Sequence, residues 1–571
     1  MISETIKKQI EGGLVRAGFD LSHEVLAKWD WDIELTKDFT HGDYASNVAL
    51  IVGKNTAVSP LEIAEKLLPH MDNDADGYIK KVEIAGPGFL NFFLSDKYYS
   101  DVLLEIVEKK NKWGWSDELA EKKVMVEYTD PNVMKPFHIG HLMSNAIGEA
   151  LARLFETSGA EVRRVNYFSD VGLAIAKAVW GMKEMRQTMP DENAPVADRT
   201  DFLGKAYVFG VAQATSPEVL EEIKQINKQI YNKLQGESLE LYEIGRKWSL
   251  EHFEGLYKKL GTSFDYLIGE SEIVTQALEL AKESLLKKIF VESEGAIVFK
   301  AEAYGLHTRV FVTKEQLPTY EAKDMALVKK KFELFSFDNS VSITGNEQNE
   351  YFKVVLKAIN LMMPEMAGKT KHMSHGMLRL SSGKMSSRTG NVITGETLIT
   401  DVEKIAQEKN PDPKVASAVA IGAIKYSILR QAPSKDIIFD FEKSLSLEGD
   451  SGPYLQYAYA RARSVLAKAN FSAQGGPSSD WQFSNEEKKI MRLIARLPEI
   501  LAKAREELAP QFVCTYLIEL AGAWNSYYAS NKIIDEDDKA TTQARLALTV
   551  AIAQTLANGL WTLGIPALNR M

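Results

Sequence analysis

Two histidines on either side of a glycine are the residues of this sequence best suited to phosphate chemistry. They occur in the run His138-Ile139-Gly140-His141. Side chains three positions apart at the start of a helix can point to the same side, so both imidazoles could donate hydrogen bonds to phosphate oxygens. Gly140 has no side chain and lets a flat base or a phosphate approach the backbone. The tetrapeptide alone also fits ordinary helix-capping or surface histidines, so its surroundings must decide.

The surrounding residues predict the elements that would hold these histidines. Residues 124–128 form a strand-like run, and a turn signal follows at 130–132. Residues 142–159 are apolar at helical spacing, and residues 162–168 form a second apolar run. Strand, turn, helix and strand make one parallel, right-handed βαβ unit. Ligands of such sheets lie beyond the carboxyl ends of the strands, against helix N-termini, which is where both histidines fall.

A second stretch suited to phosphates lies at 381–391, SSGKMSSRTGN. Small residues and glycines around Lys384 make a loop that can fold over phosphates. The alternative is a flexible surface turn. The presence of the histidine run in the same chain favours the phosphate-binding interpretation.

Together these stretches resemble a known family. The run EYTDPNVMKPFHIGHL, residues 127–142, resembles class I aminoacyl-tRNA synthetases, and most closely the arginyl-tRNA synthetases. Lys384 and the two residues after it are similar to the start of the KMSKS loop of that class, but Ser387 stands where a second lysine is usual. Lys135, just before the histidines, is expected to supply the missing positive charge.

The resemblance implies a reaction in two steps. The carboxylate of arginine attacks the α-phosphate of ATP, and the 3′-terminal ribose of tRNA(Arg) then takes the arginyl group. No protein nucleophile is needed, so catalysis rests on positioning and charge stabilisation, and Mg²⁺ is expected to arrive with ATP. The implied catalytic residues are His138, His141, Lys384 and Lys135. The implied ATP site consists of His138, Gly140, His141, Met377, Lys384 and Ser386.

Another group of positions concerns the amino acid. Thr319 can cap a helix on which Tyr320 and Asp324, four residues apart, share a face. The alternative is a surface helix with a solvated aspartate. Gln348 follows a strand-like run at 340–344, on the ligand side of a parallel sheet, although a helix-capping role is equally open.

The resemblance assigns these positions to an arginine site. A guanidinium is planar, charged and rich in donors, so its site needs carboxylates or other acceptors. Tyr320 and Asp324 are implied to hold the guanidinium. A wrong substrate would leave buried acceptors unpaired, so no editing domain is expected. The residues implied to lie nearer the α-amino and carboxylate end are Glu127, Asn132 and Gln348.

Candidate contacts with tRNA lie in both terminal regions. Residues 85–92 resemble the N-terminal additional domain of the family, in which Phe89 could stack on an unpaired base and Asn91 could hydrogen-bond to it. Tyr457 and Arg461 are four apart on a predicted helix and could also stack on RNA bases. Packing within a helical bundle is the ordinary alternative for this second pair.

Composition limits these interpretations. A net charge of −10 argues against a generally basic surface, so RNA contacts must come from local patches. Cys514 is the one cysteine among 571 residues, which excludes intramolecular disulfides and cysteine-rich zinc sites. Residues 546–569 carry no formal charge, but polar residues within them and Pro566 predict a buried helix rather than a membrane span. The protein is expected to be cytoplasmic, without zinc and away from membranes.

The expected fold class is α/β multidomain. It comprises a Rossmann-like parallel-sheet catalytic domain with an insertion, an α+β N-terminal domain and an all-α C-terminal helical bundle. The chain is expected to act as a monomer on tRNA(Arg), L-arginine and ATP. The expected division is 1–110 for the N-terminal tRNA-contacting domain, 111–400 for the catalytic domain with its insertion at about 181–290, 401–445 for a connecting helical segment, and 446–571 for the anticodon-binding domain.

Two other classes of function remain open at this stage. One is a non-catalytic RNA-binding relative that keeps the fold, which the intact His138, His141 and Lys384 argue against. The other is a small-molecule nucleotidylyltransferase with the same histidine motif, for which the long terminal domains would be superfluous. Arginine-dependent exchange of pyrophosphate into ATP, with and without tRNA, separates these classes.

Overall fold

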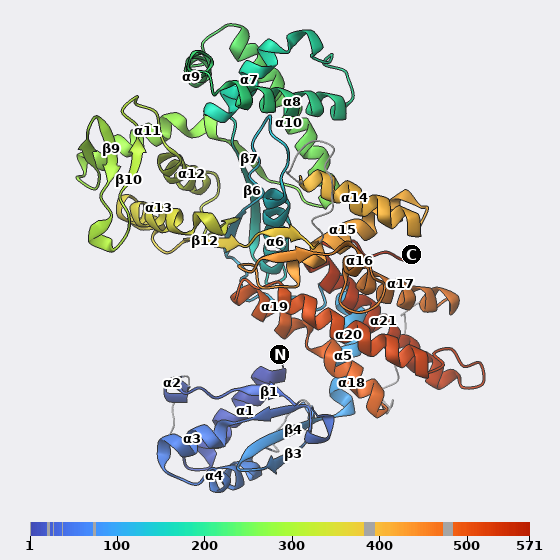
Figure 1. Ribbon diagram of the computed structural model, residues 1–571. Helices are drawn as coiled ribbons and strands as arrows, with labels where there is room; N and C mark the ends of the chain where they lie inside the picture. Colours follow the sequence, from blue (N-terminus) through green and yellow to red (C-terminus); the bar gives the residue numbers. More distant parts are fainter. Residues whose placement is uncertain are drawn as a thin grey trace.

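The computed structural model describes residues 2–19, 23–26, 28–36, 38–71, 76–381, 394–471 and 483–571. Figure 1 shows a small N-terminal unit at one end of the molecule and a sheet surrounded by helices towards the other. The helical C-terminal region lies between them and contacts both. Contacts across these boundaries include the guanidinium of Arg492 with the backbone carbonyl of Thr36 and the packing of α19 on α6 (bounds below).

A parallel five-stranded sheet forms the centre of the molecule. Its order is β12-β11-β5-β6-β7, and every neighbouring pair is parallel. The order reverses between β5 and β11, because the chain first builds outward through β6 and β7 and later returns to the other side of β5. Ligands of such sheets bind at the carboxyl edge beside this reversal. The strands are β5 (Lys123–Glu127), β6 (Glu161–Phe168), β7 (Tyr266–Gly269), β11 (Asn339–Gly345) and β12 (Thr370–His375).

Helix α6 (Ile139–Glu156) connects β5 to β6 and packs on both strands and on β11. It is buried almost throughout, as its apolar spacing requires. Gly148 lies directly against the ring of Tyr128, where an added Cβ would stand 2.2 Å from the ring. Gly159 adopts a φ of +83° in the turn into β6, a conformation that favours glycine. The predicted βαβ unit is therefore confirmed.

A helical unit lies between β6 and β7 in sequence and forms the upper part of Figure 1. Its helices pack on one another, with α7 against α8, α9 and α10. β7 lies within the range 181–290 but joins the central sheet, so that range is not helical throughout. The helices are α7 (Leu173–Glu184), α8 (Val196–Gln213), α9 (Pro217–Tyr231) and α10 (Glu237–Leu260).

A three-stranded antiparallel sheet lies to one side of the central sheet and has its own hydrophobic core. Three phenylalanine rings, of Phe290, Phe299 and Phe311, pack together in that core. The strands are β8 (Val291–Ser293), β9 (Ala296–Phe299) and β10 (Arg309–Val312). The helices that pack around them and beside the central sheet are α11 (Glu270–Leu286), α12 (Tyr320–Leu334) and α13 (Asn349–Met362).

The N-terminal unit is a four-stranded antiparallel sheet in the order β1-β2-β4-β3, with helices on it. Its strands are β1 (Ile33–Leu35), β2 (Tyr44–Ser46), β3 (Ile79–Ala85) and β4 (Phe89–Leu94). Its helices are α1 (Ile2–Arg16), α2 (His23–Leu26), α3 (Val48–Thr56) and α4 (Pro60–Leu67). Helix α5 (Asp96–Lys109) leaves this unit and packs on α18 and α21 of the C-terminal region.

The last part of the chain is mainly helical. A short strand in it, β14 (Ile437–Phe439), pairs in parallel with β13 (Leu378–Leu380). No helix of the described residues is long and apolar enough to cross a membrane, and the uncharged run at 546–569 lies largely in α21, which ends before Pro566 as expected. The helices are α14 (Gly395–Lys409), α15 (Pro413–Leu429), α16 (Phe441–Ser444), α17 (Gly452–Lys468), α18 (Asn485–Ala495), α19 (Leu497–Glu506), α20 (Gln511–Ser530) and α21 (Lys539–Thr562).

Polar contacts join the end of α21 to the last turn of α6. The guanidinium of Arg153 donates to the carbonyl of Trp561 at 2.7 Å and pairs with Glu149 at 2.6 Å. The buried ammonium of Lys425, on α15, donates to the carbonyl of Gly564 at 2.9 Å. The C-terminal helices are thus attached to the helix that carries both histidines.

The predicted fold class is confirmed. The central sheet is parallel, the N-terminal unit combines an antiparallel sheet with helices, and the C-terminal region is helical. One local expectation was wrong. Thr319 occupies the N-cap position of α12, but its hydroxyl donates to the carbonyl of Val310, at 2.7 Å, instead of accepting from the first turn of the helix.

Candidate active site

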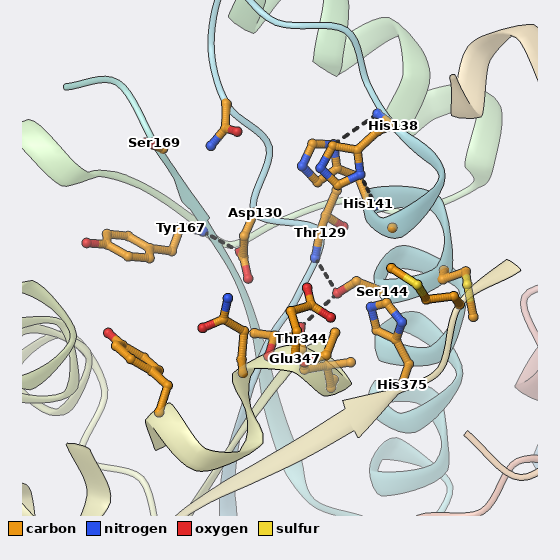
Figure 2. Close-up of a pocket in the computed structure, with 18 of the residues that line it drawn as sticks. Thr129, Asp130, His138, His141, Ser144, Tyr167, Ser169, Thr344, Glu347 and His375 are labelled. Carbon is orange, nitrogen blue, oxygen red and sulfur yellow. Dashed lines mark hydrogen bonds between the residues drawn. The ribbon is translucent and has the colours of Figure 1, made fainter. Parts of the chain in front are cut away.

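A cavity of about 990 Å³ opens at the carboxyl edge of the central sheet, beside the reversal in strand order. Figure 2 shows side chains from several elements that point into it. They come from the turn after β5, the start of α6, the end of β6, the start of α12 and the segments that follow β11 and β12. The position agrees with the site expected from the βαβ unit.

The two histidines lie at the first turn of α6 with their rings stacked. The ring centroids of His138 and His141 are 3.4 Å apart and the planes differ by 25°. His138 is the N-cap residue, and each ring accepts a hydrogen bond at Nδ1 from the backbone N–H of the other residue, at 3.2 and 3.4 Å. A neutral imidazole has one donor and one acceptor nitrogen. Since Nδ1 accepts in both rings, the proton of each neutral ring is on Nε2.

Both imidazoles are neutral near pH 7. Burial lowers the pKa of His141 well below its usual value, and the neighbouring His138 and Lys135 lower it further. The pKa of His138 is also lowered, by partial removal from water and by Lys135. A neutral pair can donate hydrogen bonds from Nε2 without carrying a charge of its own.

The turn that leads from β5 to the histidines has a constrained backbone. Thr129 and Asp130 have φ values of +82° and +46°, a region that a β-branched residue such as threonine rarely adopts. The hydroxyl of Ser144, on α6, accepts from the N–H of Thr129 at 3.0 Å and donates to the carbonyl of Ile343 at 2.9 Å. The amide of Asn145 donates to the hydroxyl of Thr129 at 3.0 Å. Helix α6 therefore fixes this turn and joins it to β11.

Two glutamates at the pocket are neutralised by buried lysines. The ammonium of Lys331 lies 2.5 Å from the carboxylate of Glu127, and both side chains are almost completely buried. The ammonium of Lys323 lies 2.5 Å from the carboxylate of Glu270, with the same degree of burial. Such pairs are costly to break because removing one partner leaves the other charge buried and unpaired.

Asp324 lies on the first turns of α12 and has no such cation. The hydroxyl of Tyr351 donates to its carboxylate at 2.5 Å, and no Lys, Arg or His of the described residues lies within ion-pair distance. Burial raises the pKa of Asp324 to about 7, and the carboxylates of Glu127 and Glu270 contribute to the increase. The carboxylate is thus placed to receive a cation from a ligand.

The other residues expected to bind arginine also line this cavity. Tyr320, which is 61% exposed, lies one turn before Asp324. Gln348 occupies the N-cap position of α13 without a capping hydrogen bond from its side chain, so the alternative role as a helix cap is not observed. Asn132 lines the cavity and accepts from the ammonium of Lys135 at 3.3 Å.

The positions expected to bind ATP are only partly described. His138, Gly140, His141 and Met377 all line the cavity. Lys135 is absent from the described lining and faces the ring of Tyr207 on α8 at 5.3 Å, although it contacts Asn132.

Lys384 and Ser386 lie outside the described residues. The chain on both sides of their segment reaches the cavity. Leu380 lines it, and Thr394 forms a β-bridge with His138. The N–H of Gly395 donates to the carbonyl of Phe137 at 2.7 Å.

The candidate tRNA residues do not belong to the described lining of this cavity, and they differ in exposure. Phe89, at the start of β4, is 37% exposed, whereas Asn91 is only 7% exposed within the same strand. Arg461 donates to the hydroxyl of Tyr457 at 3.0 Å and to the side chain of Asn525 at 2.7 Å. Both Tyr457 and Arg461 are half-buried, so the pair packs between helices and presents part of its surface.

Several pocket residues could not be found from sequence motifs. Lys331 is 204 positions from Glu127, and Tyr351 is 27 positions from Asp324, so neither pairing leaves a local pattern. Asp130 could have been identified as a candidate from the sequence, because it is an acidic residue inside the run 127–142.

Among the described residues, no group of three or more His, Cys, Asp or Glu side chains is arranged to hold a metal ion.

Comparisons with known families cover nearly the whole chain. Residues 103–441 match the model described as "tRNA synthetases class I (R), catalytic domain". Residues 2–94 match the "Arginyl tRNA synthetase N terminal domain", and residues 455–571 match the "DALR anticodon binding domain". The three matches follow the order of the three regions in Figure 1.

Individual proteins agree with these matches. The arginine–tRNA ligase of Clostridium perfringens is 30% identical over 100% of this chain and 99% of its own, and that of Clostridioides difficile is 31% identical over the same shares. The solved structure of Thermus thermophilus arginyl-tRNA synthetase has a TM-score of 0.81 and 25% identity, with each chain fully covered. With its stacked histidines at the expected helix terminus and its similarity extending from end to end, this chain belongs to the arginyl-tRNA synthetases of class I.

Proposed function

We propose that this chain is an arginine–tRNA ligase, which activates L-arginine with ATP and transfers it to the 3′ end of tRNA(Arg). One observation carries the assignment to this pocket. The cavity combines neutral, stacked histidines at a helix N-terminus with the half-buried carboxylate of Asp324, which has no cation partner among the described residues. The first feature suits a triphosphate and the second suits a guanidinium.

In the first step, an oxygen of the arginine carboxylate forms a bond to the α-phosphorus of ATP. The bond from that phosphorus to the oxygen bridging the α- and β-phosphates breaks, and pyrophosphate leaves with the electron pair. The Nε2–H groups of His138 and His141 would donate hydrogen bonds to the α- and β-phosphate oxygens as negative charge shifts. The positive end of the α6 dipole favours the same charge.

Positive charge for the outer phosphates would come from two lysines. Lys384 is assigned to the β- and γ-phosphates, with Lys135 supplying the charge that Ser387 does not. The lowered pKa of Lys135, caused mainly by burial, indicates that its ammonium would gain from an anionic neighbour. Mg²⁺ would enter with ATP and be held largely by phosphate oxygens and water.

The ATP site would be completed by backbone access at Gly140 and by contacts from Met377 and Ser386. In the second step, the ribose hydroxyl of tRNA attacks the carbonyl carbon of the adenylate, AMP leaves, and the hydroxyl proton is lost to solvent. Phe89, Asn91, Tyr457 and Arg461 remain the proposed tRNA contacts.

Arginine would lie with its guanidinium at Asp324 and Tyr320 and its α-carbon towards the histidines. Asn132 and Gln348, on the intervening walls, are assigned to the α-amino and carboxylate groups. The order is set by chemistry, because the carboxylate must reach the phosphate that the histidines bind.

The division of the chain at about residues 110, 400 and 445 is kept as part of this proposal, as is action by a cytoplasmic monomer. The free, buried thiol of Cys514 is compatible with a reducing compartment. Sedimentation of the full chain with and without tRNA would test the monomer.

Arginine-dependent exchange of labelled pyrophosphate into ATP tests the function directly. Exchange is expected with arginine and not with lysine or glutamine, and charging is expected on tRNA(Arg). The assay is run with and without tRNA. Absence of exchange both with and without tRNA would refute the assignment. Pyrophosphate exchange that depends on a nucleotide-accepting substrate other than arginine would favour a nucleotidylyltransferase.

A further inference from the structure

The carboxylates that line the pocket fall into two classes by their partners. Glu127, Glu270 and Glu321 each have a cationic side chain within 3.5 Å. Asp130, Asp324 and Glu347 have no ion pair with any described residue. Asp130 and Asp324 are half-buried, whereas Glu347 is exposed. Arginine carries two cations, the α-ammonium and the guanidinium. The number of unmatched, half-buried carboxylates therefore equals the number of positive groups on the substrate.

Asp130 is held in place by its backbone and by one hydrogen bond. One carboxylate oxygen accepts from the N–H of Tyr167 at 2.8 Å, and the other oxygen has no protein donor among the described residues. The left-handed φ of +46° is one that aspartate tolerates better than most residues. In Figure 2 Asp130 lies between Tyr167 and the two histidines, and all of these residues line the same cavity.

The surroundings of Asp130 disfavour its negative charge while the site holds no cation. Burial raises its pKa well above the usual value, and the carboxylates of Glu127 and Asp324 raise it further. The ammonium of Lys331 acts in the opposite direction but lies directly against Glu127. A cation bound at Asp130 would stabilise the ionised carboxylate and lower its pKa.

Glu127 is less suited to a second cation. Its charge is balanced by Lys331 at 2.5 Å, and it is only 4% exposed. An ammonium placed beside that pair would meet a net neutral group and the repulsion of Lys331. The sequence resemblance implied Glu127 as a residue near the α-amino end, but the pairing leaves Asp130 as the half-buried carboxylate of the turn before the histidines that has no ion pair with a described residue.

We propose that Asp130 binds the α-ammonium of arginine, while Asp324 binds the guanidinium, so that the two ends of the substrate are recognised by separate carboxylates. This inference rests on the proposed function and specifies how the site reads its amino acid. Asp130 would fix the α-carbon so that the substrate carboxylate faces the phosphate bound by His138 and His141. An arginine analogue without the α-amino group should consequently gain nothing from Asp130.

The test compares two ligands on isosteric variants of the full chain. Binding of L-arginine and of 5-guanidinopentanoate, which lacks the α-amino group, is measured by calorimetry without catalysis. Asp130→Asn keeps the acceptor for Tyr167 and tolerates the same backbone conformation. It is expected to weaken arginine binding by about 30-fold or more, the range for losing a charge-assisted contact, and to leave the analogue unchanged. Asp324→Asn should weaken both ligands alike.

The matched control is Glu347→Gln, an isosteric change at an exposed carboxylate of the same cavity, which should keep the discrimination between the two ligands. Equal losses for both ligands in Asp130→Asn, or no loss for either, would overturn the inference. Failure of the proposed function would look different. The wild-type chain would then bind arginine no better than lysine and show no pyrophosphate exchange.

Discussion

At the scale of single residues, the pocket depends on which carboxylates have a cation beside them. Glu127 and Glu270 are balanced by buried lysines, whereas Asp324 accepts a hydrogen bond from Tyr351 and has no cation partner among the described residues. A carboxylate without a cation in a half-buried site keeps its proton to an unusually high pH. In the proposed site, arginine binding would therefore be linked to the protonation of Asp324.

This linkage predicts a pH dependence for arginine affinity. The pKa of Asp324 is about 7, so the carboxylate is charged above that pH and loses its charge as the pH falls. The dissociation constant for arginine should rise as the pH falls below 7, by about tenfold per pH unit from Asp324 alone and more steeply where Asp130, whose pKa is also raised, takes up a proton. Tyr351→Phe removes a hydrogen bond that lowers this pKa, so the break in the profile should move to higher pH.

Calorimetric titrations between pH 5.5 and 9 measure both profiles. The control is Asp324→Ala, which should bind arginine about 100-fold more weakly, lack the break near pH 7 and still bind ATP. An unchanged break in Tyr351→Phe would show that another group governs the profile. Equal loss of arginine and ATP in Asp324→Ala would show that the aspartate does not act at the guanidinium.

The histidines predict an effect on rate rather than on affinity. His141→Ala removes one Nε2–H donor aimed at charge that develops in the transition state. The rate of arginine-dependent pyrophosphate exchange should fall about 100- to 1000-fold, while arginine binding changes little. His307→Ala serves as the control, because His307 is exposed and outside the described pocket lining. An unchanged exchange rate in His141→Ala would remove the assigned role.

At the scale of elements, α6 supports both the histidines and the constrained turn before them. Ser144 joins the backbone of Thr129 to that of β11 through one hydroxyl. Its loss would remove the acceptor for the N–H of Thr129 and a donor to the carbonyl of Ile343. The turn also carries Asn132 and Asp130, so a change in α6 should be felt at the amino-acid end of the pocket.

Ser144→Ala is expected to destabilise the protein by about 1–3 kcal/mol, the cost of unpaired buried polar groups, and to raise the KM for arginine. Denaturant unfolding and steady-state exchange kinetics measure the two effects. Ser158→Ala is the matched control, since Ser158 is buried in the turn that follows the same helix and its hydroxyl contacts only the carbonyl of Leu154 among the described residues. Equal kinetic effects in both variants would contradict a link between Ser144 and the turn.

The elements near the motifs could be predicted from the sequence, and the reasons are local. Alternation and helical spacing are read within a window of some ten to eighteen residues, which suffices for β5, α6 and β6. The pairing of β13 with β14 joins segments 59 positions apart and leaves no such signal. The N-cap position of α12 was also predictable, but the partner of Thr319 was not, because β10 supplies a competing acceptor.

The site followed the same rule. Most predicted site residues of the run 127–142, together with the predicted residues Tyr320, Asp324, Gln348 and Met377, line one cavity where the strand order reverses, but Lys135 is absent from the described lining. Lys331 and Lys323 were not found, because a lysine on an amphipathic helix reads as a solvated charge until a distant carboxylate is placed against it. Their effect is large, since they decide which carboxylates remain free for substrate.

At the scale of the whole molecule, the C-terminal helices and the catalytic sheet share a polar junction around Arg153. Its guanidinium contacts the carbonyls of Trp561 and Gly261 and stacks over the ring of Trp561 at 5.0 Å. Helix α6 has 18 residues, so the histidines and this junction are held along one rigid element of about 27 Å. Separating the C-terminal helices from the catalytic sheet should therefore cost more free energy than the packing of their hydrophobic cores alone implies.

Arg153→Met keeps an apolar side chain of similar length but removes both backbone contacts. Amide hydrogen exchange around residues 560–565 should accelerate by about 10- to 100-fold, which corresponds to the loss of about 1.4–2.7 kcal/mol of local stability. Arg163→Met is the control, because Arg163 contacts Glu161, the carbonyl of Val162 and the ring of Phe335, and none of these residues belongs to the end of α21. Unchanged exchange in Arg153→Met would show that other contacts hold the end of α21.

The fastening of Lys425 to Gly564 also bears on how this protein could be shortened. The ammonium is completely enclosed, and burial together with Arg153 lowers its pKa to about 7. Deleting residues 564–571 would take away the carbonyl it donates to and the carbonyl of Pro566 that receives the amide of Gln456. In a chain truncated in this way, the buried amine of Lys425 would lose its hydrogen-bond acceptor next to the catalytic region. An affinity tag is therefore better attached at the N-terminus.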